Sequence, residues 1–157
     1  GFEDLLRLKI TDRMPVIIAV QSAGSDNLVR NIGNEKFEVI PSSTIADSIS
    51  VDLPGNFFMA GRYIGKYSGK TMTVTDDEIL HASRQLAEST GLFAEPAAAA
   101  AYAGYMKYHR QGLLPDDSDN VVLLTGSGLK DTGSVRPMIR IPEAISPDID
   151  NLEKALG

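Results

Sequence analysis

The sequence predicts an α/β fold of three layers (α/β/α), in which helices cover both faces of a mostly parallel β-sheet. Apolar, largely β-branched runs at 16–20, 71–74 and 121–124 have the length and composition of buried strands. Segments with helical periodicity separate these runs, and strands that alternate with helices typically pair in parallel. With 157 residues, the chain is long enough to bury one core, so we treat 1–157 as a single domain.

The first half of the chain is predicted to alternate between helices and strands. Pro15 ends the first helix, because the residues before a proline avoid the helical conformation. Ser25 is a candidate N-cap, and Phe57, Ala60 and Ile64 would share one face of a helix. The predicted elements are a helix that ends near 11–12, a strand at 16–20, a short helix from Ser25 to Ile32, an irregular stretch at 33–55 with an ordered piece at 44–51, a helix from 56 to about 67, and a strand at 71–74.

In the second half, capping signals define the helices more sharply. Thr75 and Glu78 form a capping box at the start of a helix that ends near Gly91. Pro96 stands where a first-turn proline belongs and opens a second helix, which continues to about Gln111. The remaining predicted features are a buried stripe of Ile79, Ala82 and Leu86, a polar turn at 116–120, a strand at 121–124, and a last helix after Ser146-Pro147 that carries Ile149, Leu152 and Leu156.

Composition excludes several classes of protein. Fifteen Lys and Arg against 21 Asp and Glu give a formal net charge of −6, which argues against nucleic acid or an anionic membrane as the main partner. The longest apolar run, 15–20, is far shorter than the roughly 20 residues of a membrane helix. The absence of cysteine excludes disulfides, thiolate catalysis and Cys-based zinc sites. It also fits a reducing compartment, so the expected location is the cytoplasm.

Two motifs that resemble ligand sites are better explained as turns. Ser68-Gly-Lys-Thr71 resembles the end of a P-loop, but Ile64 stands where the first glycine belongs, and the segment leaves a helix to enter a strand. The acidic stretch 116–120 lacks the turn glycine and the distal Glu of a calcium loop, so no metal site is predicted. His81 and His109 are expected to be exposed or to interact with a helix end, and not to be catalytic.

Ligands of open α/β sheets bind beyond the carboxyl ends of the strands, so the candidate segments follow Val20, Val74 and Leu124. After Leu124, the glycines of Gly126-Ser-Gly128 would let the backbone approach a ligand closely or turn sharply. Asp131 replaces the third glycine of a dinucleotide fingerprint, so that site is not predicted. A plain turn after a buried strand is the alternative explanation.

Three carboxylates lie in loops or at a helix start, where chemistry could occur: Asp47, Asp52 and Glu95. Glu95 also has a structural interpretation, because a carboxylate directly before a first-turn proline favours the helix start. The residue pattern leaves both roles open.

Two longer segments carry a family resemblance. Residues 91–100 (Gly-Leu-Phe-Ala-Glu-Pro-Ala-Ala-Ala-Ala) and 121–131 (Val-Val-Leu-Leu-Thr-Gly-Ser-Gly-Leu-Lys-Asp) are similar to the C-terminal signatures of threonine synthases. These are pyridoxal-phosphate enzymes of the fold type II, or tryptophan-synthase β, group. The sequence departs from the family at Ala98, where Ser or Gly is more frequent, and at Ser127, where many members have His. Further similar segments occur in the family's order at 18–24, 44–49 and 74–79.

The resemblance implies that five residues contact the cofactor. The Thr125 hydroxyl would meet the pyridine nitrogen of pyridoxal phosphate. A neutral hydroxyl leaves that nitrogen largely unprotonated, which moderates carbanion delocalisation into the ring and suits elimination and replacement at the β or γ carbon. Gly126 and Gly128 would let the chain turn beneath the ring. Ala46 would pass close to the ring face, and Glu95 would face the same cavity.

The family's catalytic lysine, which binds the cofactor as a Schiff base, is not found in this sequence. In the family it lies in a Ser-Phe-Lys-Asp-Arg type segment, and no lysine here has that context; Ser68-x-Lys70 comes nearest but lacks the following Arg. The glycine-rich loop for the cofactor phosphate is also not found, and the sequence does not begin with Met. We therefore expect the chain to be the C-terminal portion of a longer enzyme, inactive by itself.

The resemblance implies that the complete enzyme is a lyase of threonine biosynthesis, which converts O-phosphohomoserine and water to L-threonine and phosphate. Pyridoxal phosphate would be bound in the full-length protein and not retained by this part. The implied partners are the small-molecule substrate, the missing N-terminal part and a second copy in a homodimer. Two alternatives are a fold type II threonine or serine dehydratase, which more commonly has Ser at the ring-nitrogen position, and a non-catalytic interaction domain on the same scaffold.

Overall fold

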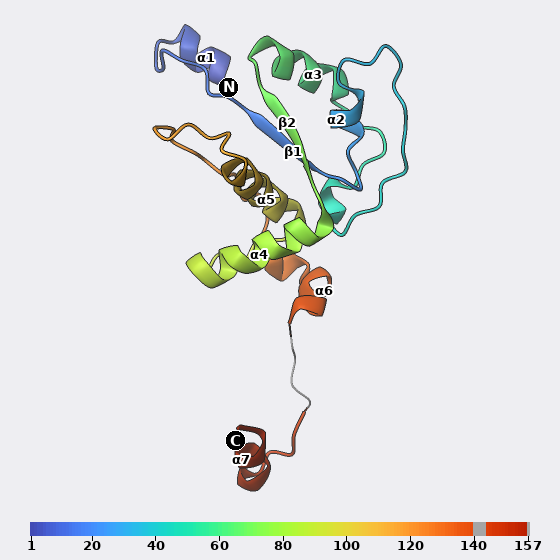
Figure 1. Ribbon diagram of the computed structural model, residues 1–157, viewed down its shortest axis with the longest axis vertical. Helices are drawn as coiled ribbons and strands as arrows, with labels where there is room; N and C mark the ends of the chain where they lie inside the picture. The colour runs from blue at the N-terminus through green and yellow to red at the C-terminus, as the bar shows by residue number, and fades with distance from the viewer. Residues whose placement is uncertain (140–143, 157) are drawn as a thin grey trace.

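A computed structural model describes residues 1–139 and 144–156 (Figure 1). In chain order, its helices, strands and 3₁₀ helices (η) are α1 (Phe2–Arg7), β1 (Ile18–Ser22), α2 (Asn27–Asn31), η1 (Asp47–Ile49), α3 (Phe57–Lys66), β2 (Lys70–Val74), α4 (Asp76–Thr90), α5 (Pro96–Arg110), η2 (Gly128–Lys130), α6 (Thr132–Val135), η3 (Arg136–Met138) and α7 (Ile149–Leu156). Every helix predicted from the sequence is present, with its ends shifted by a few residues.

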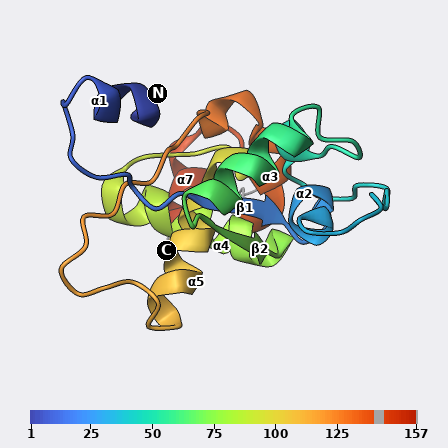
Figure 2. The same ribbon diagram turned by 90° about the horizontal axis from the view of Figure 1, so that it is seen from above.

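Strands β1 and β2 lie side by side in parallel, with Ile18 opposite Lys70 and Ser22 opposite Val74. Helices α4 and α5 lie on one side of this pair, and α2 and α3 lie on the other (Figures 1 and 2). The predicted α/β architecture with a parallel sheet is therefore confirmed. Because the strands are parallel and in register, their carboxyl ends meet at one edge of the sheet.

The first strand begins later than predicted. Val16 and Ile17 are exposed, whereas the paired segment continues through polar Gln21 and Ser22. Apolar character marked the start of the run, but the hydrogen-bonded register with β2 decides where the strand lies. The polar end is stabilised because Ser22 Oγ donates a hydrogen bond to Asp76.

The predicted strand at 121–124 is not formed. Residues 121–125 have no regular structure and no ladder partner in the part of the chain that the structure describes. Val121 is 84% exposed and Leu123 is 72% exposed, whereas Leu124 packs against the core. An apolar run needs cover on both faces, and this segment has it on one face only, so the prediction of a fully buried strand is wrong for this structure.

The core between the sheet, α4 and α5 is built largely from alanine. Its buried apolar members are Ala46, Val74, Ile79, Ala82, Leu86, Ala94, Ala98, Ala99, Ala100 and Ala103. The predicted stripe of α4 is thereby confirmed. Small side chains allow close approach of the backbones: a Cβ atom on Gly104 of α5 would lie only 2.4 Å from Cγ2 of Val20 in β1.

The capping box at the start of α4 is confirmed. The N–H of Glu78 donates to Thr75 Oγ1 (3.2 Å), and the N–H of Thr75 donates to Glu78 Oε2 (2.9 Å). Lys107 and Arg110 of α5 also contact the Glu78 carboxylate, at 3.3 and 3.4 Å. Partial burial raises the pKa of Glu78, but the Thr75 N–H and the Lys107 ammonium together lower it by more, so the pKa lies below the usual 4.5.

Helix α1 is joined to α3 by polar contacts away from the carboxyl ends of the strands. Lys66 Nζ lies 2.5 Å from Glu3 Oε1, and the Tyr67 hydroxyl donates to the same oxygen. Hydrogen bonds from Lys66 and Tyr67 lower the pKa of Glu3 to about 2. The Glu3 carboxylate therefore stays ionised, and able to accept both hydrogen bonds, down to strongly acidic pH.

Replacing Gly104 by alanine should destabilise the protein. Gly→Ala inside a helix normally stabilises by about 0.5–1 kcal/mol, but here the new methyl group would overlap Val20, and overpacking costs about 1–3 kcal/mol. Gly65→Ala in α3 is the matched control, because nothing lies within 4 Å of its added Cβ. Urea unfolding should give a lower midpoint for Gly104→Ala and an equal or higher one for Gly65→Ala. A stabilised Gly104→Ala variant would contradict the close packing.

The stability that Glu78 contributes should be lost in acid. Because its pKa is lower in the folded state, the contribution is complete above the unfolded-state pKa near 4.5 and disappears as the pH falls through the folded-state pKa. Glu78→Gln should therefore lower the free energy of unfolding at about pH 7, by an amount on the order of 1 kcal/mol. Chemical unfolding of both proteins at about pH 7 and about pH 3 measures this effect, and the difference should shrink at the lower pH.

Candidate functional site

The carboxyl ends of β1 and β2 meet at a polar network centred on Asp76, the first residue of α4. The Asp76 carboxylate accepts hydrogen bonds from Ser22 Oγ (3.1 Å), from Thr44 Oγ1 (2.5 Å) and from the N–H of Ile45 (3.0 Å). One carboxylate therefore joins the end of β1, the start of α4 and the segment that leads into η1. The rule for ligand sites in open sheets points to this edge.

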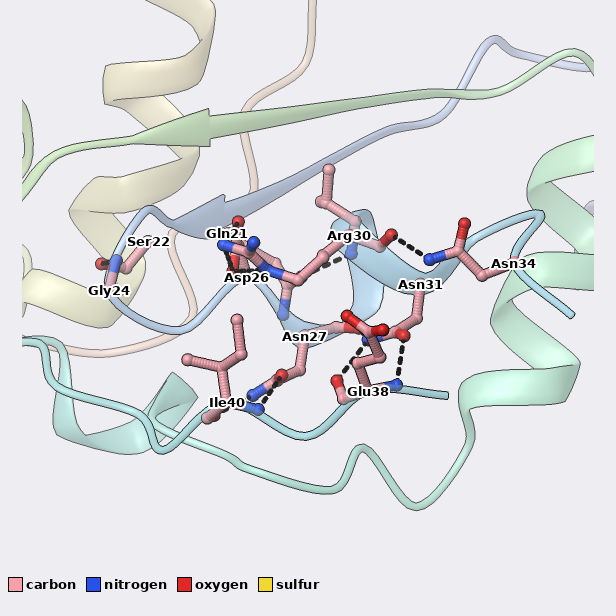
Figure 3. Close-up of polar contacts among 11 residues, drawn as sticks. Gln21, Ser22, Gly24, Asp26, Asn27, Arg30, Asn31, Asn34, Glu38 and Ile40 are labelled. Carbon is pink, nitrogen blue, oxygen red and sulfur yellow. Dashed lines mark hydrogen bonds and ion pairs between the residues drawn. The ribbon is translucent and has the colours of Figure 1, made fainter. Parts of the chain in front are cut away.

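Buried asparagines of α2 hold the irregular segment 33–55 in place (Figure 3). Asn27 Nδ2 donates to the carbonyl of Ile40 (2.7 Å), and Asn27 Oδ1 accepts from its N–H (3.0 Å). Asn31 pairs with the backbone of Glu38 in the same way, at 2.9 and 2.7 Å. Each side-chain amide thus satisfies one donor and one acceptor, as a neighbouring strand would. A segment with little regular structure is fixed by these contacts.

Ser25 belongs to this set of contacts and does not cap α2, so the predicted N-cap is wrong. Asp26 occupies the cap position. The Ser25 hydroxyl lies 2.9 Å from Ser42 Oγ and 3.1 Å from the carbonyl of Ile49, and it accepts from the N–H of Val51 at 3.0 Å. Tertiary hydrogen bonds on both sides of η1 outweigh the local capping preference.

A short antiparallel pairing brings together four of the five residues predicted to contact a cofactor: Glu95, Thr125, Gly126 and Gly128. Ala94 pairs with Ser127 at its centre. The N–H of Glu95 donates to the carbonyl of Gly126 (3.1 Å), and the N–H of Gly128 donates to the carbonyl of Phe93 (2.8 Å). The start of α5 and the segment before η2 therefore form one unit.

Both glycines of this unit lie close against neighbouring side chains. A Cβ atom on Gly126 would lie 1.9 Å from Oε1 of Glu95, and one on Gly128 would lie 2.5 Å from the ring of Phe93. Neither glycine has a positive φ, so neither is needed for a left-handed turn. The sequence indicated close approach or a sharp turn, and close approach to neighbouring side chains is what the structure contains.

Glu95 lines a polar hollow of about 380 Å³ beside the start of α5. Only 7% of Glu95 is exposed, and its Oε2 lies 3.3 Å from Lys130 Nζ. Glu95 occupies the N-cap position of α5, but its side chain makes no capping hydrogen bond. Asp47 and Ser48 of η1, together with Asp131, share the wall of this hollow. The carboxylate is directed toward an ion pair in the hollow and not toward the helix end.

Thr125 lines a second hollow, of about 560 Å³, with Leu124, Ser127 and residues 91–94. Its side chain is exposed, but it does not follow a strand, because the expected strand at 121–124 is missing. Ala46 is separate from both hollows: it is fully buried in the core. The antiparallel pairing thus brings the segments that carry Thr125 and Glu95 together, whereas Ala46 lines neither hollow.

Sequence reasoning missed the Asp76 network. The local sequence indicates for Asp76 only a negative charge at the positive end of a helix dipole, because its hydrogen-bond partners lie 31, 32 and 54 residues away. The signal that could have found them is a cluster of hydroxyl and carboxylate side chains at both predicted strand ends. A search for such clusters would have selected Ser22 and Asp76 together.

The two motifs interpreted as turns contain turn residues in the structure, at 67–68 and at 116–117. Residues 68–71 lead from the end of α3 into β2, and this helix-to-strand order is the reverse of a P-loop. His81 and His109 are exposed. Across 1–139 and 144–156, no group of three or more potential metal ligands is present, and no helix in these ranges is long and apolar enough to cross a bilayer.

Comparison with known proteins defines the class. The family described as pyridoxal-phosphate dependent enzyme matches residues 2–126, and the chain belongs to this family. Many solved structures share the fold, among them an ammonia-lyase and a racemase. The match to a fungal L-serine ammonia-lyase from Rhizomucor miehei covers 79% of this chain and 40% of the ammonia-lyase chain, with a TM-score of 0.63 and 22% sequence identity. The match to maize serine racemase covers 97% of this chain and 41% of the racemase chain, with a TM-score of 0.60 and 18% sequence identity. The fold is that of fold type II pyridoxal-phosphate enzymes.

The sequence relatives include threonine synthases, as the two signature segments indicated. The enzyme of Methanosarcina acetivorans is 33% identical over 99% of this chain and 39% of its own length. The enzyme of Synechocystis sp. is 33% identical over 100% of this chain and 40% of its own length. The enzyme of Methanocaldococcus jannaschii is 31% identical over 99% of this chain and 39% of its own length. The chain therefore spans about 40% of the curated relatives it matches.

Gly126→Ala should displace the Glu95 carboxylate from its buried position. The added Cβ overlaps Oε1 of Glu95, so the side chain must move away from Lys130, and we expect a loss of about 1–3 kcal/mol of stability. Glu95→Ala removes the overlapping group. The double variant should therefore lose less free energy of unfolding than the sum of the losses of the two single variants, by about 1 kcal/mol or more. Urea unfolding of all four proteins measures the coupling, and strict additivity would contradict this contact.

Proposed function

We propose that residues 1–157 are the C-terminal part of a pyridoxal-phosphate-dependent threonine synthase, which converts O-phosphohomoserine and water to L-threonine and phosphate. One observation carries this proposal: relatives with that name match nearly the whole chain at 31% and 33% identity, and the chain covers only 39% or 40% of each. The cofactor-binding lysine and the phosphate loop, which the family resemblance implies, are then supplied by another part of the same polypeptide.

The position of Thr125 supports a role in cofactor binding. Its side chain is exposed at the hollow of about 560 Å³, so its hydroxyl is accessible to a ligand. When bound, pyridoxal phosphate supplies an electron sink for carbanions formed on the substrate. The hydroxyl of Thr125 would hydrogen-bond to the pyridine nitrogen without protonating it. Gly126 and Gly128 hold the following backbone against the start of α5 and thereby orient Thr125. The N–H of Glu95, which donates to the carbonyl of Gly126, keeps that backbone in place, while the buried Glu95 carboxylate pairs with Lys130.

A dehydratase is the alternative within the same fold. The solved structures include a threonine deaminase from T.th., with TM-score 0.55 and 19% identity. At that identity the likeness shows the fold alone, whereas the sequence relatives at 31% and 33% identity favour a threonine synthase. The complete enzyme would act in the cytoplasm as a homodimer; the absence of cysteine fits a reducing compartment, and the family resemblance supports the dimer.

Assays of the full-length gene product test the proposal. We expect threonine and phosphate from O-phosphohomoserine, and no ammonia from threonine; residues 1–157 alone should be inactive and should not retain the cofactor. In the full-length enzyme, Thr125→Val should lower kcat about 10–100-fold, because a hydrogen bond to the cofactor is lost, whereas Thr125→Ser should keep most of the activity. Release of ammonia from threonine would identify a dehydratase, and a cofactor-free product without either reaction would favour the interaction domain.

A further inference from the structure

We infer that Asp76 and Thr44 are positioning residues: they hold η1 against the start of α5 and so shape the polar hollow that Glu95 lines. This inference rests on the proposed function, because it assigns the network a part in that enzyme's site. Neither residue lines this hollow, so both act through the backbone of the segment between them.

The contacts tie two consecutive residues, Thr44 and Ile45, directly to one carboxylate and tie Ala46 to it through Thr44. Thr44 Oγ1 donates to Asp76 Oδ1 at 2.5 Å and accepts from the N–H of Ala46 at 3.2 Å. The N–H of Ile45 donates to Asp76 Oδ2 at 3.0 Å. A short hydrogen bond to an ionised acceptor is among the stronger kinds in proteins. The backbone from Thr44 to Ala46 therefore has a defined position relative to α4.

This position controls the wall of the hollow. Ala46 is fully buried in the core, and Asp47 and Ser48 follow it directly and line the hollow together with Glu95. A shift of the backbone at Ala46 moves both wall residues. On the other side of η1, Ser25 independently holds Ile49 and Val51. Loss of the Asp76 contacts would therefore release one end of η1 and leave the other attached.

The helix itself does not require these contacts. The capping box of Thr75 and Glu78 already provides hydrogen-bond acceptors for two backbone N–H groups at the start of α4. Asp77, which is exposed, provides negative charge in the same first turn. Asp76 instead accepts from Ser22, Thr44 and Ile45. Its place at the sheet edge and its direction toward the loop indicate a role in placing η1.

Asp76→Asn in the full-length enzyme tests this role, with Asp77→Asn as the matched control. The side-chain amide that this substitution introduces has one acceptor oxygen where the carboxylate has two, so the hydroxyl of Thr44 and the N–H of Ile45 can no longer each donate to an oxygen of their own, and the negative charge is lost. We expect about tenfold faster amide exchange in residues 43–47, a changed absorbance of the bound cofactor, and about a tenfold loss in kcat/KM. The control has the same charge change on the same helix turn and should leave all three measurements unchanged.

Variants of Thr44 and Ile79 separate positioning from general stability. Thr44→Val removes the hydroxyl and should reproduce the effects, whereas Thr44→Ser keeps it and should restore the values of the unmodified enzyme. Ile79→Val weakens the buried core without touching the network, so it should lower the unfolding midpoint but leave the cofactor absorbance and the exchange of residues 43–47 unchanged.

The outcomes distinguish this inference from the proposed function. If the unmodified enzyme binds cofactor and forms threonine, but Asp76→Asn behaves like Asp77→Asn, the inference is wrong and the function stands. If Ile79→Val produces the same spectral change as Asp76→Asn, the effect is global and the inference is also wrong. If the unmodified enzyme binds no pyridoxal phosphate, the proposed function fails, and the exchange of residues 43–47 by itself decides whether Asp76 holds η1.

Discussion

The Asp76 carboxylate joins pieces of the chain that are distant in sequence. It accepts hydrogen bonds from the end of β1, from the segment before η1 and from a backbone N–H, while it begins α4. These elements meet only because β1 and β2 are parallel and in register, which puts both strand ends at one edge. The location of η1, and with it the polar hollow next to Glu95, depends on this junction.

Small side chains set the distance between the sheet and the helices that cover it. Alanine predominates in the core, and Gly104 brings α5 into direct contact with Val20. The same principle operates at the candidate site, where Gly126 and Gly128 bring a loop against Glu95 and Phe93. Close approach of the glycine backbone to neighbouring side chains, and not conformational freedom, explains why glycine occupies these three positions. The site is consequently built on a tightly packed support.

The distribution of apolar surface agrees with the proposal that the chain is part of a longer enzyme. Phe58, Val121 and Leu123 are among the large apolar side chains that are mostly exposed, and exposed apolar surface commonly marks a contact with another protein surface. The relatives are more than twice as long as the segment they share with this chain. Residues 121–125 therefore have the composition of a buried strand and lack a partner among the described residues.

Local signals in the sequence determined the helices, their caps and the parallel order of the first two strands. The capping box at Thr75, the first-turn Pro96 and the glycine at 91 are each read from neighbouring residues, because helix starts and ends depend on hydrogen bonds within a few positions. The family signatures likewise selected the residues around Thr125. Only the tertiary structure decided that residues 121–124 stay unpaired and that Ser25 serves the loop rather than a helix. It also decided that Asp76 is bonded to the segment before η1. Such contacts join residues that lie tens of positions apart, as Ser22 and Asp76 do, and a long-range hydrogen bond or strand pairing leaves no periodic pattern in the sequence.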